Sequence, residues 1–382
     1  MNVLTDKLHA LLEQAVAEKQ VAGMNVLVLK GGREVAYSEA GFADIAAGKP
    51  FCRDTVCRIY SMTKPVTAVA AMILVERGQL DLGAWLGSIL PAFANMQVWE
   101  NGKKVPARRN ILVKDLLNMT SGLSYPGMDE SGQEVARVFE EADARLYGDD
   151  PMTTMELVNR LGTCGLAFHP GDKWMYGTSA DVLGAVIEKV SGMPYGVFLQ
   201  KEIFEPLGMT DTGFYVPEEK QHRLAQVYRQ GALEPEITNN LDICYTQHRA
   251  PAFESGGAGL VSTIDDYARL AQSLLGHGRQ ILKPSSIAYL TRGKLLPWQQ
   301  ESLWRSWESM QGYGYSNLMR VMEEPGMALL TGWKGEYGWD GWLGTYFCNS
   351  PENDTTVLMF CQRIDAGTME ITRKLRNVIA AE

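Results

Sequence analysis

The sequence has few cysteines, and they form no recognisable pattern. Its six cysteines lack both the short spacings of metal ligands and the density of a disulfide scaffold, so we expect reduced structural thiols. No apolar run is long enough to span a bilayer, and the N-terminal residues predict an amphipathic helix where a signal peptide would stand. The lack of these features favours a cytoplasmic location for the protein. The cysteines are Cys52, Cys57, Cys164, Cys244, Cys348 and Cys361.

The chain also lacks a net positive charge and cofactor-binding motifs. The formal net charge of −9 argues against nucleic acid or an anionic membrane as a partner. The chain contains no His-Glu-x-x-His motif, no Walker loop and no dinucleotide fingerprint, so no metal and no cofactor are expected. A Gly-x-Ser-x-Gly elbow is missing as well, which argues against a Ser-His-Asp hydrolase.

The length and the distribution of apolar residues predict two domains. A chain of 382 residues exceeds the usual size of a single core. Strand patterns occur near both ends, whereas helical patterns dominate between them. We therefore predict an α/β (α+β) fold, in which an antiparallel sheet flanked by helices is built from residues 1–80 and 250–382. A mainly helical domain, residues 81–249, is inserted between these two parts.

Several elements follow from local signals. Gly31-Gly32 predicts a hairpin turn between two strands near the N-terminus. The acidic segment Ser124–Asp150 has few bulky apolar residues and is interpreted as a solvated surface excursion, with a mobile flap as the alternative. The predicted strands are Met24–Leu29, Arg33–Ser38, Thr55–Tyr60, Tyr313–Arg320, Ala328–Trp333, Gly344–Asn349 and Thr356–Cys361, and the clearest helices are Val113–Met119, Ala180–Val190 and Thr368–Ala380.

The most informative segment is Ser61-Met62-Thr63-Lys64, where a predicted strand leads into an almost wholly apolar helix. Residues i and i+3 share a helix face, so Lys64 can reach the Ser61 hydroxyl. Free N–H groups at a helix N-terminus favour developing negative charge. A partly desolvated lysine has a lowered pKa and can accept the hydroxyl proton. The alternative is a serine that only caps the helix.

Two further segments could complete a catalytic site. Tyr176 lies on a predicted loop before the helix at Ala180, where a tyrosine can point into a cleft, and beside Lys64 its phenol should lose its proton more readily than usual. The glycine-rich segment Gly338–Thr345 allows close backbone approach, and one of its N–H groups could form an oxyanion hole with the Ser61 amide. The alternatives are a packing role for Tyr176 and a simple hairpin turn.

The order Ser-x-x-Lys, Tyr-x-x, Trp-x-Gly resembles the serine β-lactamase/penicillin-binding-protein superfamily. The likeness covers nearly the whole chain and is strongest to the class C-like branch that includes family VIII carboxylesterases. It implies a β-lactamase/transpeptidase-like fold. Connecting phrases that match are Asp115–Leu123, Pro206–Met209 and Gly256–Thr263.

The resemblance also implies roles for single residues. Ser61 would be the acylated nucleophile, Lys64 its activating partner and Tyr176 the proton shuttle. The family's substrate-binding Asn would fall at Thr178, a departure that weakens the usual contact with a substrate amide. The Trp342 amide would be the second oxyanion donor.

The family's Lys-Thr-Gly motif would fall at Trp339-Asp340-Gly341. Lys and Thr normally hold a substrate carboxylate, whereas an aspartate would repel one and an indole offers an apolar wall. Six of the nine tryptophans lie between Trp298 and Trp342, which fits an apolar pocket. We therefore expect a serine hydrolase that acts on an uncharged or weakly charged small ester.

Other functions on the same site stay open. A β-lactamase or D-alanyl carboxypeptidase would need substrates outside the cytoplasm and the family's cation in the third motif. Acyl transfer to an alcohol and amide hydrolysis use the same acyl-enzyme. A silent binding module is disfavoured because Ser61, Lys64 and Tyr176 are all present.

Overall fold

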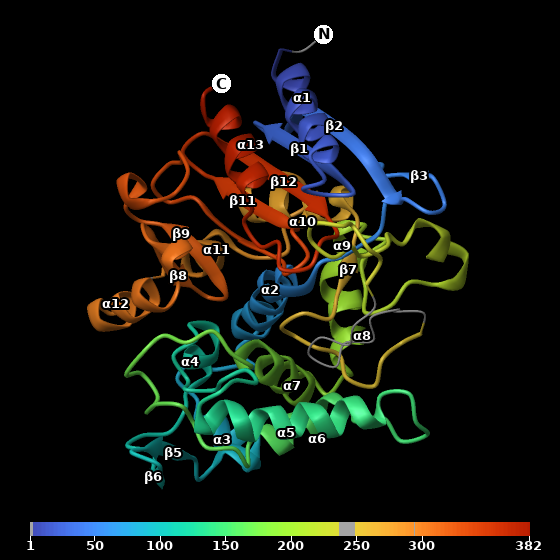
Figure 1. Ribbon diagram of the computed structural model, residues 1–382. Coiled ribbons are helices and arrows are strands. Elements are labelled where there is room, and N and C mark those ends of the chain that lie inside the picture. The colour runs from blue at the N-terminus through green and yellow to red at the C-terminus, as the bar shows by residue number, and fades with distance from the viewer. Residues whose placement is uncertain (1–2, 237–248, 294) are drawn as a thin grey trace.

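The main sheet joins the two ends of the chain. The structure is a computed structural model that describes residues 3–236, 249–293 and 295–382, and within these residues the largest element is a sheet of eight antiparallel strands. The strand order is β3-β2-β1-β12-β11-β10-β9-β8, so β1 pairs with β12 and strands from both ends of the chain form one sheet, as predicted (Figure 1). The strands are β1 (Gly23–Lys30), β2 (Arg33–Asp44), β3 (Lys49–Pro50), β8 (Tyr313–Ser316), β9 (Met319–Met322), β10 (Tyr337–Asp340), β11 (Tyr346–Ser350) and β12 (Thr355–Cys361).

Both faces of this sheet are covered, and the residues of β1 alternate between two cores. Met24, Val26 and Val28 pack with α1 (Val3–Ala17) and α13 (Glu370–Ala380) on one face. Leu27 packs on the other face in the larger core that contains α2 (Thr63–Glu76) and α10 (Ile264–Leu275). The predicted turn between β1 and β2 is confirmed, since Gly31 and Gly32 have φ of 58° and 72°.

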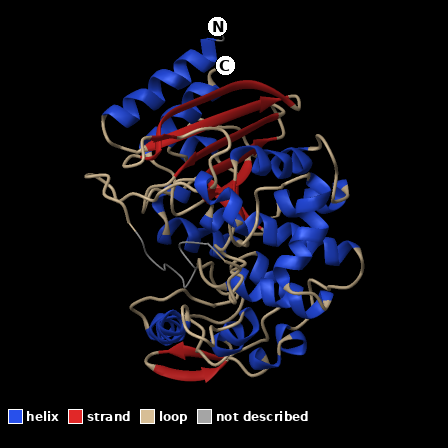
Figure 2. Ribbon diagram, turned by 90° about the vertical axis from the view of Figure 1, so that its right-hand side faces the viewer, coloured by secondary structure: helices blue, strands red, loops and turns tan. Residues whose placement is uncertain are grey.

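Helices dominate the middle of the chain. Every residue of α2 from Thr63 to Leu74 is buried, in keeping with its apolar sequence, because this helix lies between the sheet and the helical part (Figure 1). A small hairpin, β5 (Gln97–Glu100) and β6 (Lys103–Pro106), lies at the far end from the main sheet (Figure 2). The other α-helices are α3 (Leu86–Ile89), α4 (Val113–Leu117), α5 (Glu130–Arg145), α6 (Thr154–Leu161), α7 (Ser179–Ser191), α8 (Tyr195–Leu199), α9 (Glu205–Leu207), α11 (Pro284–Arg292) and α12 (Pro297–Ser306).

Three predicted strands differ from the structure. The one before Ser61 is reduced to β4 (Cys57–Arg58), which pairs with β7 (Val261–Ser262). Tyr313–Arg320 is the start of a hairpin, β8 and β9, because its middle residues 317 and 318 adopt positive φ and form a tight turn. Ala328–Trp333 forms no strand, since it lies in the connection between β9 and β10, which pair with each other.

The acidic segment Ser124–Asp150 is also different from its expected form. It contains α5, whose Val135, Phe139 and Ala142 are buried at helical spacing. The solvated excursion predicted for this segment is therefore wrong, because acidic residues mark only the outer face of a packed amphipathic helix. The division into domains at residues 81–249 stays a prediction.

Short helical turns complete the described secondary structure: η1 (Tyr60–Met62), η2 (Pro91–Phe93), η3 (Gln200–Phe204), η4 (Glu218–Arg223), η6 (Glu308–Met310) and η7 (Pro325–Met327). In the part of the chain that the structure describes, no single helix has the length and apolar composition to cross a membrane. One pair, Ser179–Ser191 and Tyr195–Leu207, meets that criterion only when joined, and it is bent by 77°.

Candidate active site

Ser61 lies in the 3-10 turn η1, between β4 and α2. The preceding residue, Tyr60, has a φ of 42°, a left-handed conformation that a side chain disfavours. Tyr60 is buried, and its hydroxyl has no hydrogen-bond partner among the described residues. Such strain persists only where the surroundings fix it, and it is frequent at functional sites. Ser61 itself is partly exposed, so its hydroxyl stands at the surface of a rigid turn.

Lys64 lies at the start of α2 and is fully buried. Its Nζ donates to Ser61 Oγ at 3.3 Å, to the Tyr125 hydroxyl at 3.1 Å and to the Gly257 carbonyl at 2.8 Å. Burial lowers the pKa of Lys64 to about 7, against the opposing effect of the Asp181 charge. The lowered pKa expected from the sequence is confirmed, and it makes the amine available as a base near neutral pH.

Tyr176 reaches Ser61 from the loop before α7. Its hydroxyl donates to Ser61 Oγ at 2.8 Å. The loop lies tightly against its neighbour, because a Cβ on Gly177 would be 2.0 Å from the Leu123 carbonyl oxygen. The expectation of an easily ionised phenol is wrong: burial raises the pKa of Tyr176 above its ordinary value. Tyr176 therefore keeps its proton at neutral pH and is a hydrogen-bond donor to Ser61.

Aromatic rings enclose Tyr176. The ring centroids of Tyr125, Trp307 and Trp339 lie 5.6, 5.4 and 5.6 Å from that of Tyr176. Trp339 Nε1 donates to the Tyr176 hydroxyl at 3.2 Å. Because Trp339 is only 1% exposed, the expectation that its indole forms an apolar wall for the substrate is wrong. The indole instead holds the hydroxyl that reaches Ser61.

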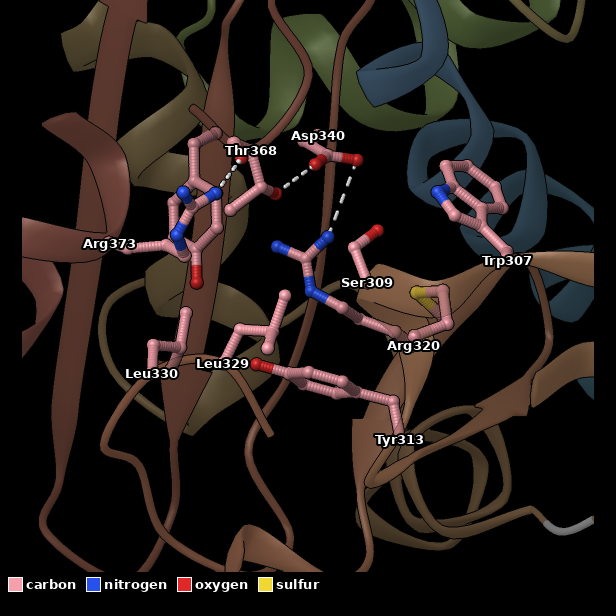
Figure 3. A pocket seen from close by; sticks show the side chains of 11 residues that line it. Trp307, Ser309, Tyr313, Arg320, Leu329, Leu330, Asp340, Thr368 and Arg373 are labelled. Carbon is pink, nitrogen blue, oxygen red and sulfur yellow. Dashed lines mark hydrogen bonds and ion pairs between the residues drawn. The ribbon is translucent and has the colours of Figure 1, made fainter. Parts of the chain in front are cut away.

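Asp340 follows Trp339 on β10, so its side chain points to the opposite face of the strand. Arg320 on β9 lies 3.3 Å from its carboxylate, and Thr368 donates a short hydrogen bond to the same group (Figure 3). All three side chains line a pocket on this face together with Arg373. Arg320 compensates the negative charge, which corrects the expectation that Asp340 would repel a substrate carboxylate.

The end of β10 approaches the turn that carries Ser61. A Cβ on Gly341 would lie 2.4 Å from the Ile59 carbonyl oxygen, so only glycine allows this contact. The ring of Trp342 meets the ring of Tyr60 edge-on, with 5.1 Å between centroids. The peptide between Gly341 and Trp342 therefore lies beside η1, where the resemblance places the second oxyanion donor.

Thr178 occupies the N-cap position of α7 and is fully buried. Its hydroxyl donates to the Ser124 carbonyl at 3.2 Å. This bond fixes the loop that carries Tyr176, and the burial argues against the substrate contact expected at Thr178.

A model of the Beta-lactamase family matches residues 8–381. The chain belongs to this family. It is 29% identical to the esterase EstB of Burkholderia gladioli, over 99% of this chain and 95% of that protein. It is 31% identical to the lovastatin esterase of Penicillium rubens, over 89% of each chain. Among solved structures, EstCE1, described as a hydrolase with promiscuous acyltransferase activity, superposes with a TM-score of 0.83 at 26% identity, over 99% of this chain and 98% of that one. The predicted β-lactamase-like fold is confirmed.

The sequence patterns do not indicate three of the groups that surround Lys64 in the structure. Tyr125 begins the segment that was interpreted as surface, and Asp181 looks like an ordinary acidic residue in the first turn of α7. The Gly257 carbonyl belongs to Gly256–Thr263, a segment that the sequence marks only as a phrase matching the family. None of the three has a spacing to Ser61 that indicates contact.

The described residues contain no group of three or more His, Cys, Asp and Glu side chains that could hold a metal ion. The five cysteines that the structure describes are free thiols. The sixth, Cys244, lies outside the described residues.

Proposed function

We propose that this chain is a serine hydrolase that cleaves small carboxylic esters through an acyl-enzyme on Ser61. The observation that carries the proposal is the position of Ser61 Oγ, which is hydrogen-bonded to Lys64 Nζ at 3.3 Å and to the Tyr176 hydroxyl at 2.8 Å. Acyl transfer needs one group that takes the proton of the nucleophile and another that protonates the leaving group. The site has both, and the esterase and hydrolase relatives support an enzyme of this kind.

In the acylation step, Lys64 takes the Ser61 proton while Oγ bonds to the ester carbonyl carbon. The amine is unprotonated above its pKa of about 7. The backbone N–H groups of Ser61 and Trp342 donate to the oxyanion that forms. As the bond to the alcohol oxygen breaks, Tyr176 gives its proton to that oxygen, and the Lys64 ammonium returns a proton to the phenolate.

Deacylation uses the same groups with water as the nucleophile. Lys64 takes a proton from water while the hydroxide oxygen bonds to the acyl carbon. When the bond to Ser61 Oγ breaks, the Lys64 ammonium returns the proton to the serine oxygen. The carboxylic acid leaves, and the charges and protons of the site are those at the start.

Two features support an uncharged or weakly charged ester over a β-lactam as the substrate. The position of the family's lysine is taken by Trp339, which is buried and bonded to Tyr176. The next residue, Asp340, is paired with Arg320. Neither side chain supplies a free cation for a β-lactam carboxylate, and two relatives carry esterase names.

Acyl transfer to an alcohol is the second candidate function. The solved structure of EstCE1 is described as a hydrolase with promiscuous acyltransferase activity. Transfer differs from hydrolysis only in the nucleophile that meets the acyl-enzyme. Product analysis with a p-nitrophenyl ester and added short-chain alcohol separates the two, because transfer yields a new ester and hydrolysis yields the acid.

The proposal is tested by intact-mass labelling with a fluorophosphonate, beside turnover of a panel of p-nitrophenyl esters and a chromogenic cephalosporin. The wild type should gain one label and hydrolyse the short-chain esters faster than the cephalosporin. Ser61→Ala should lose both the label and the turnover. Ser88→Ala is the matched control and should behave as the wild type, because within the described residues the Ser88 hydroxyl bonds the Trp85 carbonyl, away from Ser61.

Labelling of the Ser61→Ala variant would show that Ser61 is not the nucleophile. Cephalosporin turnover faster than ester turnover would replace the esterase with a β-lactamase.

A further inference from the structure

A buried carboxylate lies behind the Lys64 amine. Asp181, in the first turn of α7, is 2% exposed. Its Oδ1 accepts hydrogen bonds from the Ser255 hydroxyl at 2.5 Å and from the Gly257 N–H at 3.0 Å. The burial of a carboxylate is costly unless it is bonded and its charge is met by an opposite charge. The two bonds supply the first requirement, and they tie α7 to the segment 255–257.

Gly257 connects this carboxylate to the lysine. Its N–H donates to Asp181 Oδ1, while its carbonyl accepts from Lys64 Nζ at 2.8 Å. The contact is close, because a Cβ on Gly257 would lie 2.9 Å from Asp181 Oδ2 and 3.1 Å from the Tyr125 hydroxyl. Movement of Asp181 therefore moves the carbonyl on which the amine is held.

Asp181 supplies the negative charge that acts on Lys64. Among the described residues, the other titratable groups that lie against the amine are two phenols: the Tyr125 hydroxyl accepts from Nζ at 3.1 Å, and the Tyr176 ring centroid lies 4.5 Å from Nζ. Burial raises the pKa of both phenols, so both are neutral at neutral pH. Within the described part of the chain, the hydrogen bonds of the Lys64 amine go to neutral oxygens, and Asp181 acts on the amine across Gly257.

We propose that Asp181 is a positioning residue for the acyl transfer: through Gly257 it holds the Lys64 amine against Ser61, and its charge offsets the cost of burying the ammonium. The inference goes beyond the proposed function and rests on it. Without that charge, a lysine in so dry a site would lose its proton at a lower pH. The ammonium that forms when Lys64 takes the Ser61 proton would also be less stable, so the reaction would be slower.

The test is the pH dependence of fluorophosphonate labelling of Ser61 in Asp181→Asn. Asparagine keeps the size of the side chain and an acceptor for the Ser255 and Gly257 donors, and it removes the charge while placing an NH2 group at the position of Oδ2. We expect the midpoint of the acid limb to move to lower pH by about one unit or more, as is typical for loss of a neighbouring opposite charge. The maximal rate should fall by about tenfold or more, since one pKa unit corresponds to a factor of ten.

Two variants act as controls. Asp266→Asn makes the same substitution at another buried aspartate, on α10, which accepts from the Asp211 N–H at 2.6 Å and should leave the midpoint in place. Ser255→Ala keeps the Asp181 charge but removes a donor, so it should slow labelling without moving the midpoint. The midpoint does not depend on how much of a variant is folded, which keeps the comparison valid for poorly stable proteins.

An unchanged midpoint in Asp181→Asn, or one that moves to higher pH, overturns the proposal. If that variant yields no folded protein, Ser255→Ala decides: a wild-type labelling rate, or a displaced midpoint, overturns it. Labelling of the wild type at Ser61 tests the proposed function separately from the role of Asp181. If the wild type is not labelled there, the proposed function fails; if it is labelled and the variants do not respond as stated, only the role of Asp181 fails.

Discussion

Two buried cations lie on opposite sides of β10 and differ in their titration. Lys64, on the Trp339 side, is 0% exposed, and burial lowers its pKa to about 7. Arg320, on the Asp340 side, is 5% exposed, yet its pKa is raised. Burial is the largest single influence and lowers the pKa of Arg320, but the Asp340 carboxylate acting together with Tyr346, Tyr313 and Cys348 outweighs it.

The difference lies in the side chains themselves, because a guanidinium holds its proton more strongly than an ammonium, and in what each cation touches. Arg320 is within 3.3 Å of the Asp340 carboxylate, and its neighbour Arg376 is within 2.6 Å of the Glu336 carboxylate. The hydrogen bonds of Lys64 go to two hydroxyls and a carbonyl. A buried cation in direct contact with a carboxylate stays charged and fixes structure, whereas one held by neutral oxygens can lose its proton and act as a base.

The largest effect on the comparison is expected if Lys64, the proposed base, is replaced by a permanent cation. Lys64→Arg should lower the rate of ester hydrolysis by about 10³-fold or more, because arginine keeps its proton and cannot accept one from Ser61. Lys64→Met, which has similar length and no base, should lose as much. The rates are measured with a p-nitrophenyl ester on protein whose folding is checked by circular dichroism.

Arg376→Lys is the reciprocal control. The Arg376–Glu336 pair serves structure, so this substitution should leave the turnover per folded molecule unchanged. A Lys64→Arg enzyme within tenfold of the wild type would show that Lys64 is not the base.

On the other side of β10, loss of one member of the Glu336–Arg376 pair should lower the stability of the protein and leave the reaction at Ser61 unchanged. Glu336 and Arg376 are both almost fully buried and make two hydrogen bonds, at 2.6 and 2.9 Å. Glu336→Gln should lower the free energy of unfolding by about 3–5 kcal/mol, because it leaves the Arg376 charge buried without a counter-charge. Urea denaturation measures the loss, and labelling of Ser61 per folded molecule should not change. Slower labelling of the folded fraction would contradict the separation of the two sides.

Local signals account for the parts of this fold and site that could be predicted. The Gly31-Gly32 turn and the apolar run after Lys64 depend on neighbouring residues, and the i, i+3 spacing places Lys64 beside Ser61 whatever else surrounds them. Tyr176 was placed by its motif and its position before α7. The structure brings all three together, with the Tyr176 hydroxyl 2.8 Å from Ser61 Oγ.

The missed parts depend on contacts between distant segments. Arg320 reaches Asp340 only because a hairpin brings β9 beside β10, and the sequence pattern had suggested one long strand there. Asp181 meets Lys64 through Gly257, so three separate segments must pack before the contact exists. The side of β10 to which Trp339 points likewise follows from the register of β10 with β11.

Tyr176, the proposed proton donor on the Lys64 side, should show the next largest effect. Tyr176→Phe should lower turnover by about 100-fold, because the ring stays packed while the proton for the leaving oxygen is lost. Tyr315→Phe is the matched control: this tyrosine is buried in the same aromatic cluster, and its hydroxyl has no hydrogen-bond partner among the described residues. Steady-state rates with one p-nitrophenyl ester compare the two. A loss under threefold for Tyr176→Phe would reduce Tyr176 to a packing residue.

The smallest effect is expected at Trp339, which acts on the reaction only through Tyr176. Trp339→Phe keeps an aromatic ring on β10 and removes the Nε1 donor that lies 3.2 Å from the Tyr176 hydroxyl. One neutral hydrogen bond contributes about 1 kcal/mol, so kcat should fall by about fivefold while KM stays near its wild-type value. Trp304→Phe removes an indole donor of the same kind, which bonds the Tyr313 carbonyl at 2.8 Å, and should leave kcat unchanged. In the double variant Trp339→Phe/Tyr176→Phe, the loss from Trp339 should disappear, because the hydroxyl it holds is gone. Additive losses would show that the indole contributes through packing alone and not through the Tyr176 hydroxyl.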